Sequence, residues 1–426
     1  MSDIDEVVAA ISEQRLWRRL MEMATHGGTA GGGVNRPAAS AEDAAAQRQL
    51  MLWASARGFL SFRDEIGNLF IRRPGTDAAA APVVIGSHLD SQPTGGKFDG
   101  AYGVLAAFEV LEAVADAGIA TRCPIEVVSW TNEEGSRFQP GAMGSAVFAG
   151  SSALDVILAR TDGGGLRLGD ELAKVAALAP APFRAMAEVA RPTAYLEAHI
   201  EQGPLLELSG TPIGVVGGIQ GIRRFRVDVA GEEAHAGTTP RHLRKDALVA
   251  AMAAITALNR AADDVGEALR FTVGSMAVLP NSPNTVPGAV RFTIDLRHPD
   301  DATLSAFEGA IHASVEQSVQ LHRCSAGIER LTQIPPTAFD PSLLDALRDA
   351  AERLDYRHQD INSGAGHDAL HLARICPTAM IFIPCWKGIS HNEAESVEPG
   401  DAVAGARVLA AATMRLAERG GPSRQA

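Results

Sequence analysis

Short apolar runs that end in polar, glycine-rich stretches recur through the first third of the chain. The runs NLFIRRPG (68–75), APVVIGSH (81–88) and PIEVVSWTNEEG (124–135) have the length and the Val and Ile content of buried strands. Between the last two lies DGAYGVLAAFEVLEAVADAG (99–118), whose length and apolar character predict a helix. This order predicts an α/β sheet with functional loops at the carboxyl ends of its strands.

The residues before the first strand favour helices. The first ~25 residues have the spacing of an amphipathic helix, and a glycine-rich stretch, THGGTAGGGVNRP (25–37), follows as a loop. The stretch SAEDAAAQRQLMLWASARG (40–58) opens with a Ser-x-x-Asp capping signature and closes on glycine, so it also predicts a helix.

The pattern changes near residue 213. RRFRVDVAG alternates as a half-exposed strand does, and a helical pattern over 244–262 follows it. Two more strands (269–280 and 288–299) and another helix (301–320) complete a β–α–β–β–α order. We therefore predict a smaller α/β sandwich at 213–329, inserted into a larger mixed-sheet α/β domain that is formed by 1–212 and 330–426.

Composition narrows the class of protein. A chain of 426 residues is long enough for two domains. Its net charge of -13 argues against nucleic acid or an anionic membrane as partner. Its 4 cysteines are widely spaced, as expected of reduced thiols. Since there is also no apolar run of about 18 residues and no signal-peptide pattern, we expect a cytoplasmic protein.

Four segments bring histidines and carboxylates together after apolar strands: GSHLDSQPTGGKFDG, WTNEEGSRF, YLEAHIEQGP and GISHNEAE. A solvated turn explains TNEEG taken alone, and a helix start explains HNEAE, but neither explains why all four segments share this character. The candidate metal ligands in them are His88, Asp99, Glu134, His199 and His391. A mixed imidazole and carboxylate set suits Zn²⁺ or a similar divalent ion, and five ligands suit two ions that share one bridging carboxylate.

These segments, together with others along the chain, resemble those of a known family. The sequence is similar to the amidase, hydantoinase and carbamoylase branch of the dizinc aminoacylase and carboxypeptidase-like metallopeptidases. Eight motifs carry the resemblance, in family order and over nearly the whole chain: GSHLDS…GGKFDG, TNEEGSRF, EAHIEQGP, AHAGTTP, PNTVPG, DLRHPD, SGAGHDA and SHNEAE.

The resemblance implies specific roles around two divalent metal ions. Asp99 would bridge the ions, His88 and His199 would complete one site, and Glu134 and His391 the other. Glu133 matches the general base, which takes a proton from a water whose pKa the ions lower. Asp90 matches the carboxylate that orients His88. Zn²⁺ is the expected metal, and Mn²⁺, Co²⁺ and Ni²⁺ also suit such sites.

The resemblance also implies the residues that contact the substrate: Gln202, His235, Asn284, Arg297 and Gly366. Arg297 can hold an α-carboxylate as a bidentate fork, and His235 or Asn284 can stabilise an oxyanion. Arg224 is an alternative in the same region, although a solvated strand face explains it equally well. His235 in HAGTTP could also be a surface residue of a turn.

The expected activity is hydrolysis of the linear C–N amide bond of an N-carbamoyl-L-amino acid or of N-carbamoyl-β-alanine, the ureidopropionase substrate. The alternatives are allantoate, another N-acyl or amidated amino acid, and a dipeptide, although His199 favours the amidase branch over peptidases. A relative that only binds a carboxylated amide is a further alternative, but every ligand and Glu133 are present. The family implies a homodimer formed through the inserted domain, which would also act as a lid.

Overall fold

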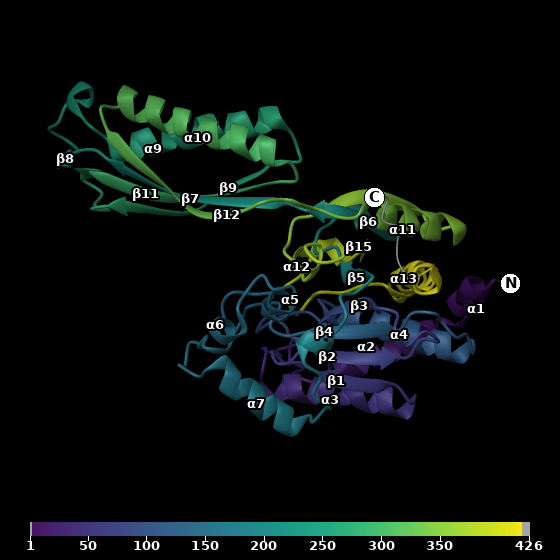
Figure 1. The fold of residues 1–426 in the computed structure, drawn as a ribbon. Coiled ribbons are helices and arrows are strands. Elements are labelled where there is room, and N and C mark those ends of the chain that lie inside the picture. The colour runs from purple at the N-terminus through teal and green to yellow at the C-terminus, as the bar shows by residue number, and fades with distance from the viewer. Residues whose placement is uncertain (1, 420–426) are drawn as a thin grey trace. The chain divides into compact units, whose positions relative to one another are not determined.

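The computed structural model describes residues 2–419. They form two compact units, which are coloured along the chain in Figure 1. Unit 2 is Gly218–Ala338, and unit 1 is formed by the chain before Gly218 and after Ala338. Because the chain leaves unit 1 and later returns to it, unit 2 is an insertion in the sequence of unit 1.

A mixed sheet forms the centre of unit 1. Together with β13, which lies at the end of unit 2, it has 9 strands in the order β1-β2-β4-β3-β5-β15-β6-β13, with β14 paired to β6. Its strands are β1 (Leu60–Arg63), β2 (Leu69–Arg73), β3 (Val83–His88), β4 (Ile125–Trp130), β5 (Ala194–Ile200), β6 (Ile213–Ile219), β13 (Thr337–Ala338), β14 (His358–Ser363) and β15 (Thr378–Ile383). The central strands β4, β3, β5 and β15 run parallel. Every residue of these four strands is buried, as expected of parallel strands that are covered on both faces.

Helices surround this sheet. They are α1 (Asp3–Ala10), α2 (Glu13–Met23), α3 (Ala41–Ala56), α4 (Ala101–Asp116), α5 (Met143–Phe148), α6 (Leu154–Leu158), α7 (Leu168–Leu178), α8 (Leu205–Ser209), α11 (Pro341–Arg353), α12 (Ala369–Leu372) and α13 (Pro399–Arg419), with short 3-10 turns η1 (Met186–Glu188) and η3 (Trp386–Gly388). The single helix predicted for the first ~25 residues is two helices, because Ser12 caps α2 by accepting the Arg15 amide. α4 is buried along most of its length and packs against β3 and β5. No helix within residues 2–419 is long and apolar enough to span a membrane.

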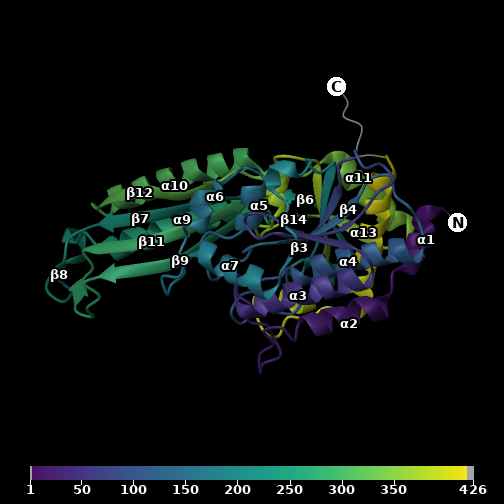
Figure 2. The same cartoon turned by 60° about the horizontal axis from the view of Figure 1, so that its bottom comes forward.

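Unit 2 is a two-layer α/β sandwich. Its antiparallel sheet has the order β12-β7-β11-β9, which Figure 2 shows. The elements are β7 (Gly221–Ala230), β8 (Ala234–His235), the 3-10 turn η2 (Arg241–Leu243), α9 (Ala247–Val265), β9 (Arg270–Leu279), β10 (Thr285–Val286), β11 (Ala289–His298), α10 (Asp301–Leu321) and β12 (Ser325–Ile334). α9 and α10 cover one face of the sheet and enclose an apolar core with it (Figure 1).

The predicted fold class, a mixed-sheet α/β domain with a smaller α/β sandwich inserted in it, is confirmed by this architecture. The edges of the insertion differ from the predicted 213 and 329. β6 is a strand of the large sheet, where it pairs with β15. β12 extends unit 2 at its other end, and most of its residues are exposed. An exposed edge strand carries little hydrophobic alternation, which is why the sequence pattern missed it.

Candidate metal centre

The carboxyl ends of the four central parallel strands carry the residues of the candidate site. His88 is the last residue of β3, and His199 is the last but one of β5. Glu134 lies in the loop after β4, and His391 lies in the segment after β15. Parallel strands bring their carboxyl ends to one edge of a sheet, so residues that are far apart in the sequence meet there.

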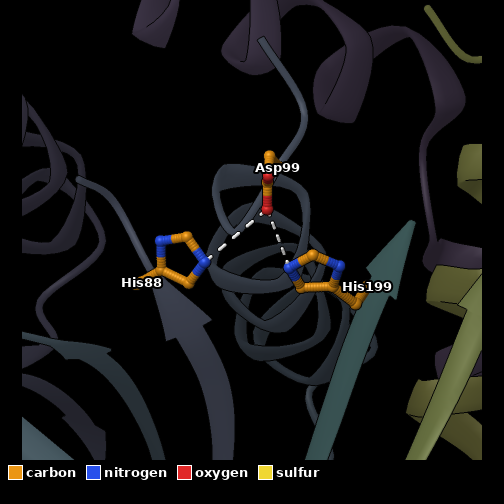
Figure 3. Close-up of side chains that lie close together, drawn as sticks. All are labelled: His88, Asp99 and His199. Carbon is orange, nitrogen blue, oxygen red and sulfur yellow. Dashed lines mark ion pairs between the residues drawn. The ribbon is translucent and has the colours of Figure 1, made fainter. Parts of the chain in front are cut away.

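His88, Asp99 and His199 form the first group, which is shown in Figure 3. Asp99 Oδ1 lies 3.7 Å from His88 Nε2 and 3.1 Å from His199 Nε2. The two imidazoles therefore point at the same carboxylate oxygen (Figure 3). All three side chains are buried.

Asp99, Glu134 and His391 form the second group. His391 Nε2 lies 3.3 Å from Asp99 Oδ2 and 3.4 Å from Glu134 Oε2. Asp99 thus directs one carboxylate oxygen to each group, which is the arrangement that a bridging ligand needs. The side chain of His391 is 50% exposed, so this group lies at the solvent side of the site.

Both groups fit a divalent metal ion. Within each group the donor atoms lie within 4.8 Å of one another, and all of them are imidazole nitrogens or carboxylate oxygens. Such a donor set suits Zn²⁺ and other divalent transition metals.

The titration behaviour of the ligands follows from burial and from their mutual contacts. Burial alone would raise the pKa of Asp99, but hydrogen bonds from His199 and His391 hold that pKa well below its usual value. The same contacts raise the pKa of each of these two histidines to about 9, against the opposing effect of burial. Burial lowers the pKa of His88 to about 4, which keeps its imidazole in the neutral form that binds metals.

Glu133, the expected general base, lies directly beside the first group. Its Oε2 is 3.4 Å from His88 Nε2. Burial and the neighbouring carboxylates of Asp368 and Glu134 raise the pKa of Glu133 well above its usual value. A raised carboxyl pKa is suited to a group that accepts a proton and then passes it on.

Asp90 connects the His88 loop to the Glu133–Glu134 turn. Its main-chain carbonyl accepts the hydrogen bond from His88 Nδ1 at 3.0 Å, whereas its carboxylate Oδ1 lies 3.6 Å from that nitrogen. The carboxylate instead accepts the main-chain amides of Glu133 and Glu134, both at 3.2 Å. His88 is therefore oriented by the backbone of Asp90, and the side chain of Asp90 fixes the turn.

Two residues that the sequence reasoning did not assign hold the carboxylate ligands. Glu395 Oε1 accepts the main-chain amides of Phe98 and Asp99 at 2.9 and 3.0 Å. Gln92 donates its main-chain amide to Glu134 Oε1 at 3.2 Å and its side-chain amide to Oε2 at 2.8 Å. Both residues lie in the histidine-rich segments quoted above. Most of their hydrogen bonds involve main-chain atoms, which every residue has, so the spacing of side chains in the sequence does not identify them.

The glycine-rich loop near the N-terminus supports the His88 loop. The Arg36 amide donates to Ser91 Oγ at 2.9 Å, and the Ser91 amide donates to the Arg36 carbonyl at 2.9 Å. Arg36 Nε also donates to the Leu89 carbonyl at 2.5 Å. The guanidinium is fully buried, and burial lowers its pKa to about 10. Arg36 thus fastens the loop on both sides of Asp90.

Two glycines allow the ligand loop to pack tightly. A Cβ on Gly100, whose φ is +63, would lie 2.3 Å from the His88 ring. A Cβ on Gly96 would lie 2.0 Å from the Glu395 carboxylate. The segment from His88 to Gly100 therefore needs residues without a side chain where it crosses these groups.

Two of the expected substrate contacts belong to unit 1. Gln202 donates from Nε2 to Asp99 Oδ2 at 3.0 Å and to Ser390 Oγ at 3.2 Å, so it lies at the ligand cluster. Gln202 Oε1 is buried and has no hydrogen-bond partner among the described residues. Gly366 lies in the loop between β14 and α12, and there is open space where its Cβ would be.

The other three expected substrate contacts belong to unit 2: His235, Asn284 and Arg297. The structure brings only the segments of His235 and Asn284 together. β8 pairs with β10 so that His235 faces Thr285, and the Ala236 amide donates to the Asn284 carbonyl at 2.9 Å. Arg297 lies at the opposite end of β11 from Ala289, about 27 Å along the strand. Its Nε donates to Asp295 Oδ1 at 2.7 Å. The alternative residue, Arg224, donates to the other oxygen of Asp295 at 2.8 Å.

Comparison with known proteins relates the chain to a family of hydrolases. The model of Peptidase family M20/M25/M40 matches residues 84–415. An N-carbamoyl-L-amino-acid amidohydrolase of Rhizobium meliloti is 42% identical, over 96% of this chain and 97% of the relative. An allantoate amidohydrolase of Bacillus subtilis is 34% identical, over 93% of this chain and 95% of the relative.

Among solved structures, an amidase of the hydantoinase/carbamoylase family from Burkholderia multivorans has a TM-score of 0.91 and 46% identity, and the match covers 96% of this chain and 98% of that one. The chain therefore belongs to peptidase family M20/M25/M40, and within it to the amidase, hydantoinase and carbamoylase branch.

Proposed function

We propose that this protein is a metal-dependent amidohydrolase that cleaves the linear C–N amide bond of an N-carbamoyl amino acid. The observation that carries the proposal is the position of Asp99 between two imidazole and carboxylate groups, with Glu133 beside the first group. The substrate class is supported by relatives named N-carbamoyl-L-amino-acid amidohydrolase, from Rhizobium meliloti and other bacteria. N-carbamoyl-β-alanine is the second substrate of this class that we propose.

In this proposal each subunit holds two divalent ions. His88 and His199 would complete one site, Glu134 and His391 the other, and Asp99 would belong to both. Zn²⁺ is the ion that the donor set suits best, while Mn²⁺, Co²⁺ and Ni²⁺ accept the same donors. Ions bound there would supply a polarised carbonyl and a water of lowered pKa.

The chain's own residues would then carry the proton. Glu133 accepts a proton from the attacking water and delivers it to the departing nitrogen. Hydrolysis of a carbamoyl group by one water yields the amino acid, CO₂ and ammonia. Asp90, Gln92 and Glu395 keep the carboxylate groups and the turn in place through the contacts described above.

Several contacts support the proposed binding of substrate. Gln202 Oε1, buried and without a described partner, is an acceptor suited to an N–H of the carbamoyl group. Arg297 would hold the α-carboxylate in competition with Asp295. The open space at Gly366 leaves room for a ligand against the main chain. His235 and Asn284 would stabilise the oxyanion.

We further propose a homodimer that associates through unit 2, which would also act as a lid. β9 is an edge strand with mostly exposed residues, and the neighbouring helix α9 exposes Val249 and Met252. Unpaired edge strands and exposed apolar side chains favour association. Because His235 and Asn284 lie beyond the Ala289 end of β11 and Arg297 lies near its other end, we assign His235 and Asn284 to the site of the partner subunit.

The proposal also assigns the enzyme to the cytoplasm, since its four cysteines are free thiols. The test of function is ammonia release by metal-loaded protein from four substrates at equal concentration: N-carbamoyl-L-amino acids, N-carbamoyl-β-alanine, allantoate and N-acetyl amino acids. The highest kcat/KM is expected for a carbamoyl compound, with N-acetyl compounds releasing no ammonia and serving as the blank. A preference for allantoate would instead favour the activity for which the 34% identical relative is named.

A further inference from the structure

Unit 2 carries a cavity far along the chain from every proposed metal ligand. Its volume is about 610 Å³, a size typical of small-molecule sites. It is formed where the turn η2, which follows β8, meets the carboxyl end of α10. The lining residues are Arg241, His242, Arg244, Leu321, His322 and Arg323.

Two arginines fix the wall of this cavity. Arg323 donates to the main-chain carbonyls of His242 and Arg244, the latter at 3.0 Å. Arg244 in turn donates to the carbonyls of Ala236 and Thr239, at 2.7 and 2.9 Å. The two segments are therefore held together by charged hydrogen bonds, and the cationic groups keep their positions.

Three other side chains of the cavity, one arginine and two histidines, lack polar partners among the described residues. Within residues 2–419, the side chains of Arg241, His242 and His322 make no hydrogen bond or ion pair, and no acidic residue lines the cavity. The neighbouring Lys245 is neutralised outside it by Glu232, at 2.7 Å.

This contrasts with most arginines on the sheet of the same unit. The sheet residues Arg224, Arg226, Arg291 and Arg330 each pair with a carboxylate. In a chain with a net charge of -13, an arginine has abundant acidic residues to pair with, yet Arg241 pairs with none of those that the structure describes. Clustered like charges repel one another unless an anion lies between them.

We propose that this cavity binds a small anion with two or more negative charges, of the phosphate or polycarboxylate class. Arg241 would supply a charged fork to the anion, and the two imidazoles would donate further hydrogen bonds. The proposed binding of this anion does not depend on the hydrolytic chemistry proposed above.

The test is isothermal titration calorimetry of the full-length protein with sodium phosphate and, in a second series, with citrate. Sodium chloride keeps the ionic strength constant, so that screening does not change during the titration. Saturable binding of either anion is expected, and the stronger of the two identifies the class. Arg241→Gln should raise the Kd about tenfold or more, and Arg241→Lys should raise it less.

Arg260→Gln is the matched control, because Arg260 is an exposed arginine of the same unit that does not line the cavity. It should leave the Kd within about twofold of the wild-type value. An equal loss of affinity in Arg241→Gln and Arg260→Gln would mean that binding depends only on the net charge of the protein. This result would overturn the proposal. So would unchanged binding in a folded Arg241→Gln variant, since the anion would then bind elsewhere, or the absence of heat with both anions.

Discussion

Most ligands of the candidate metal centre are held by contacts to the main chain, and His391 is the exception among the described residues. The His88 and His199 rings each bond a main-chain carbonyl through Nδ1, at 3.0 and 2.9 Å. The carboxylates of Asp90 and Glu395 bond main-chain amides in the loops that carry other ligands. The Nδ1 hydrogen bonds of His88 and His199 fix the tautomer and orientation of each ring, so that Nε2 of both histidines points at Asp99.

Glu133→Gln should separate metal binding from catalysis. The amide has nearly the same shape as the carboxylate but cannot accept the proton, so turnover should fall by about 10²–10⁴-fold. Metal content, measured by atomic emission on the purified protein, should stay at the wild-type value. Glu134→Gln is the companion variant, and it should lose metal as well as activity. A Glu133→Gln enzyme that releases ammonia at the wild-type rate would remove Glu133 from the proton-transfer role.

Glu395→Gln should weaken the metal centre although Glu395 is not among the proposed ligands. An amide in this place offers an N–H where the main-chain amides of Phe98 and Asp99, or the Ser390 hydroxyl, need an acceptor. Loss of such an outer contact typically lowers metal affinity about 10–100-fold. Titration with a metal-sensitive dye measures the affinity directly.

The control for this variant is Glu398→Gln, since Glu398 is an exposed glutamate three positions later in the chain. Its metal affinity should equal that of the wild type. If Glu395→Gln and Glu398→Gln bind metal equally well, the Asp99 loop does not depend on Glu395.

How much of the site the sequence could predict depended on the kind of contact involved. His88, Asp99, Glu134, His199 and His391 were predicted as a set because each residue type is a metal donor at the end of an apolar strand, and the structure brings them into the two groups. Their roles as ligands stay predictions. Glu395 and Gln92 were not assigned, because their partners include main-chain amides that every residue possesses.

At the scale of elements, helix α4 lies between two glycines, and the one before it lies against a candidate metal ligand. Gly100 precedes the helix with φ +63, and Gly118 follows it with φ +66. Both positions have a positive φ, which favours glycine, but Gly100 also has ψ -48, outside the left-handed helical region. They differ in their surroundings, because a Cβ on Gly100 meets the His88 ring, whereas no atom lies within 4 Å of a Cβ on Gly118.

This pair of glycines gives a matched comparison. Gly118→Ala should lose about 1 kcal/mol of unfolding free energy from its positive φ, and Gly100→Ala should lose more, because its φ and ψ fall in a more strained region. Only Gly100→Ala should also lose metal affinity, since its methyl group displaces the His88 ring. Thermal melting with and without added Zn²⁺ measures both effects. An identical gain in Tm on adding Zn²⁺ for the two variants would contradict a role of Gly100 in positioning His88.

The elements that the sequence missed share a physical reason. β12 and β14 are polar strands with few buried residues, and neither has the apolar run that identified β3, β4 and β15. The sheet interior imposes a hydrophobic pattern, whereas a sheet edge imposes only a backbone geometry. The same reason explains why unit 2 ends nine positions beyond the predicted residue 329, at Ala338.

For the whole molecule, the proposed dimer can be tested by combining two inactive variants. Glu133→Gln removes the proton acceptor in unit 1, and His235→Ala removes the proposed oxyanion contact in unit 2. If His235 serves the partner's site, a mixed dimer has one site in which both residues are intact. Co-expression in equal amounts should then restore about a quarter of the wild-type activity, because about half of the dimers are mixed and each has one working site.

Ammonia release by the co-expressed protein measures the recovery, and each variant expressed alone gives the background. Activity that stays at this background, while co-purification of differently tagged subunits shows mixed dimers, would place His235 in the site of its own subunit. A monomer at all concentrations would exclude the dimer itself.

The order of the ligands along the chain has a consequence for biosynthesis. His88, Asp99 and His199 all precede unit 2, whereas His391 follows it. During synthesis from the N-terminus, β3 and β5 can pair before the ribosome has made Gly218–Ala338, so the first group is complete while the second still lacks a member. A nascent chain therefore contains all members of the His88, Asp99 and His199 group long before it contains those of the second group, so in the proposed two-ion enzyme the first group would be available first.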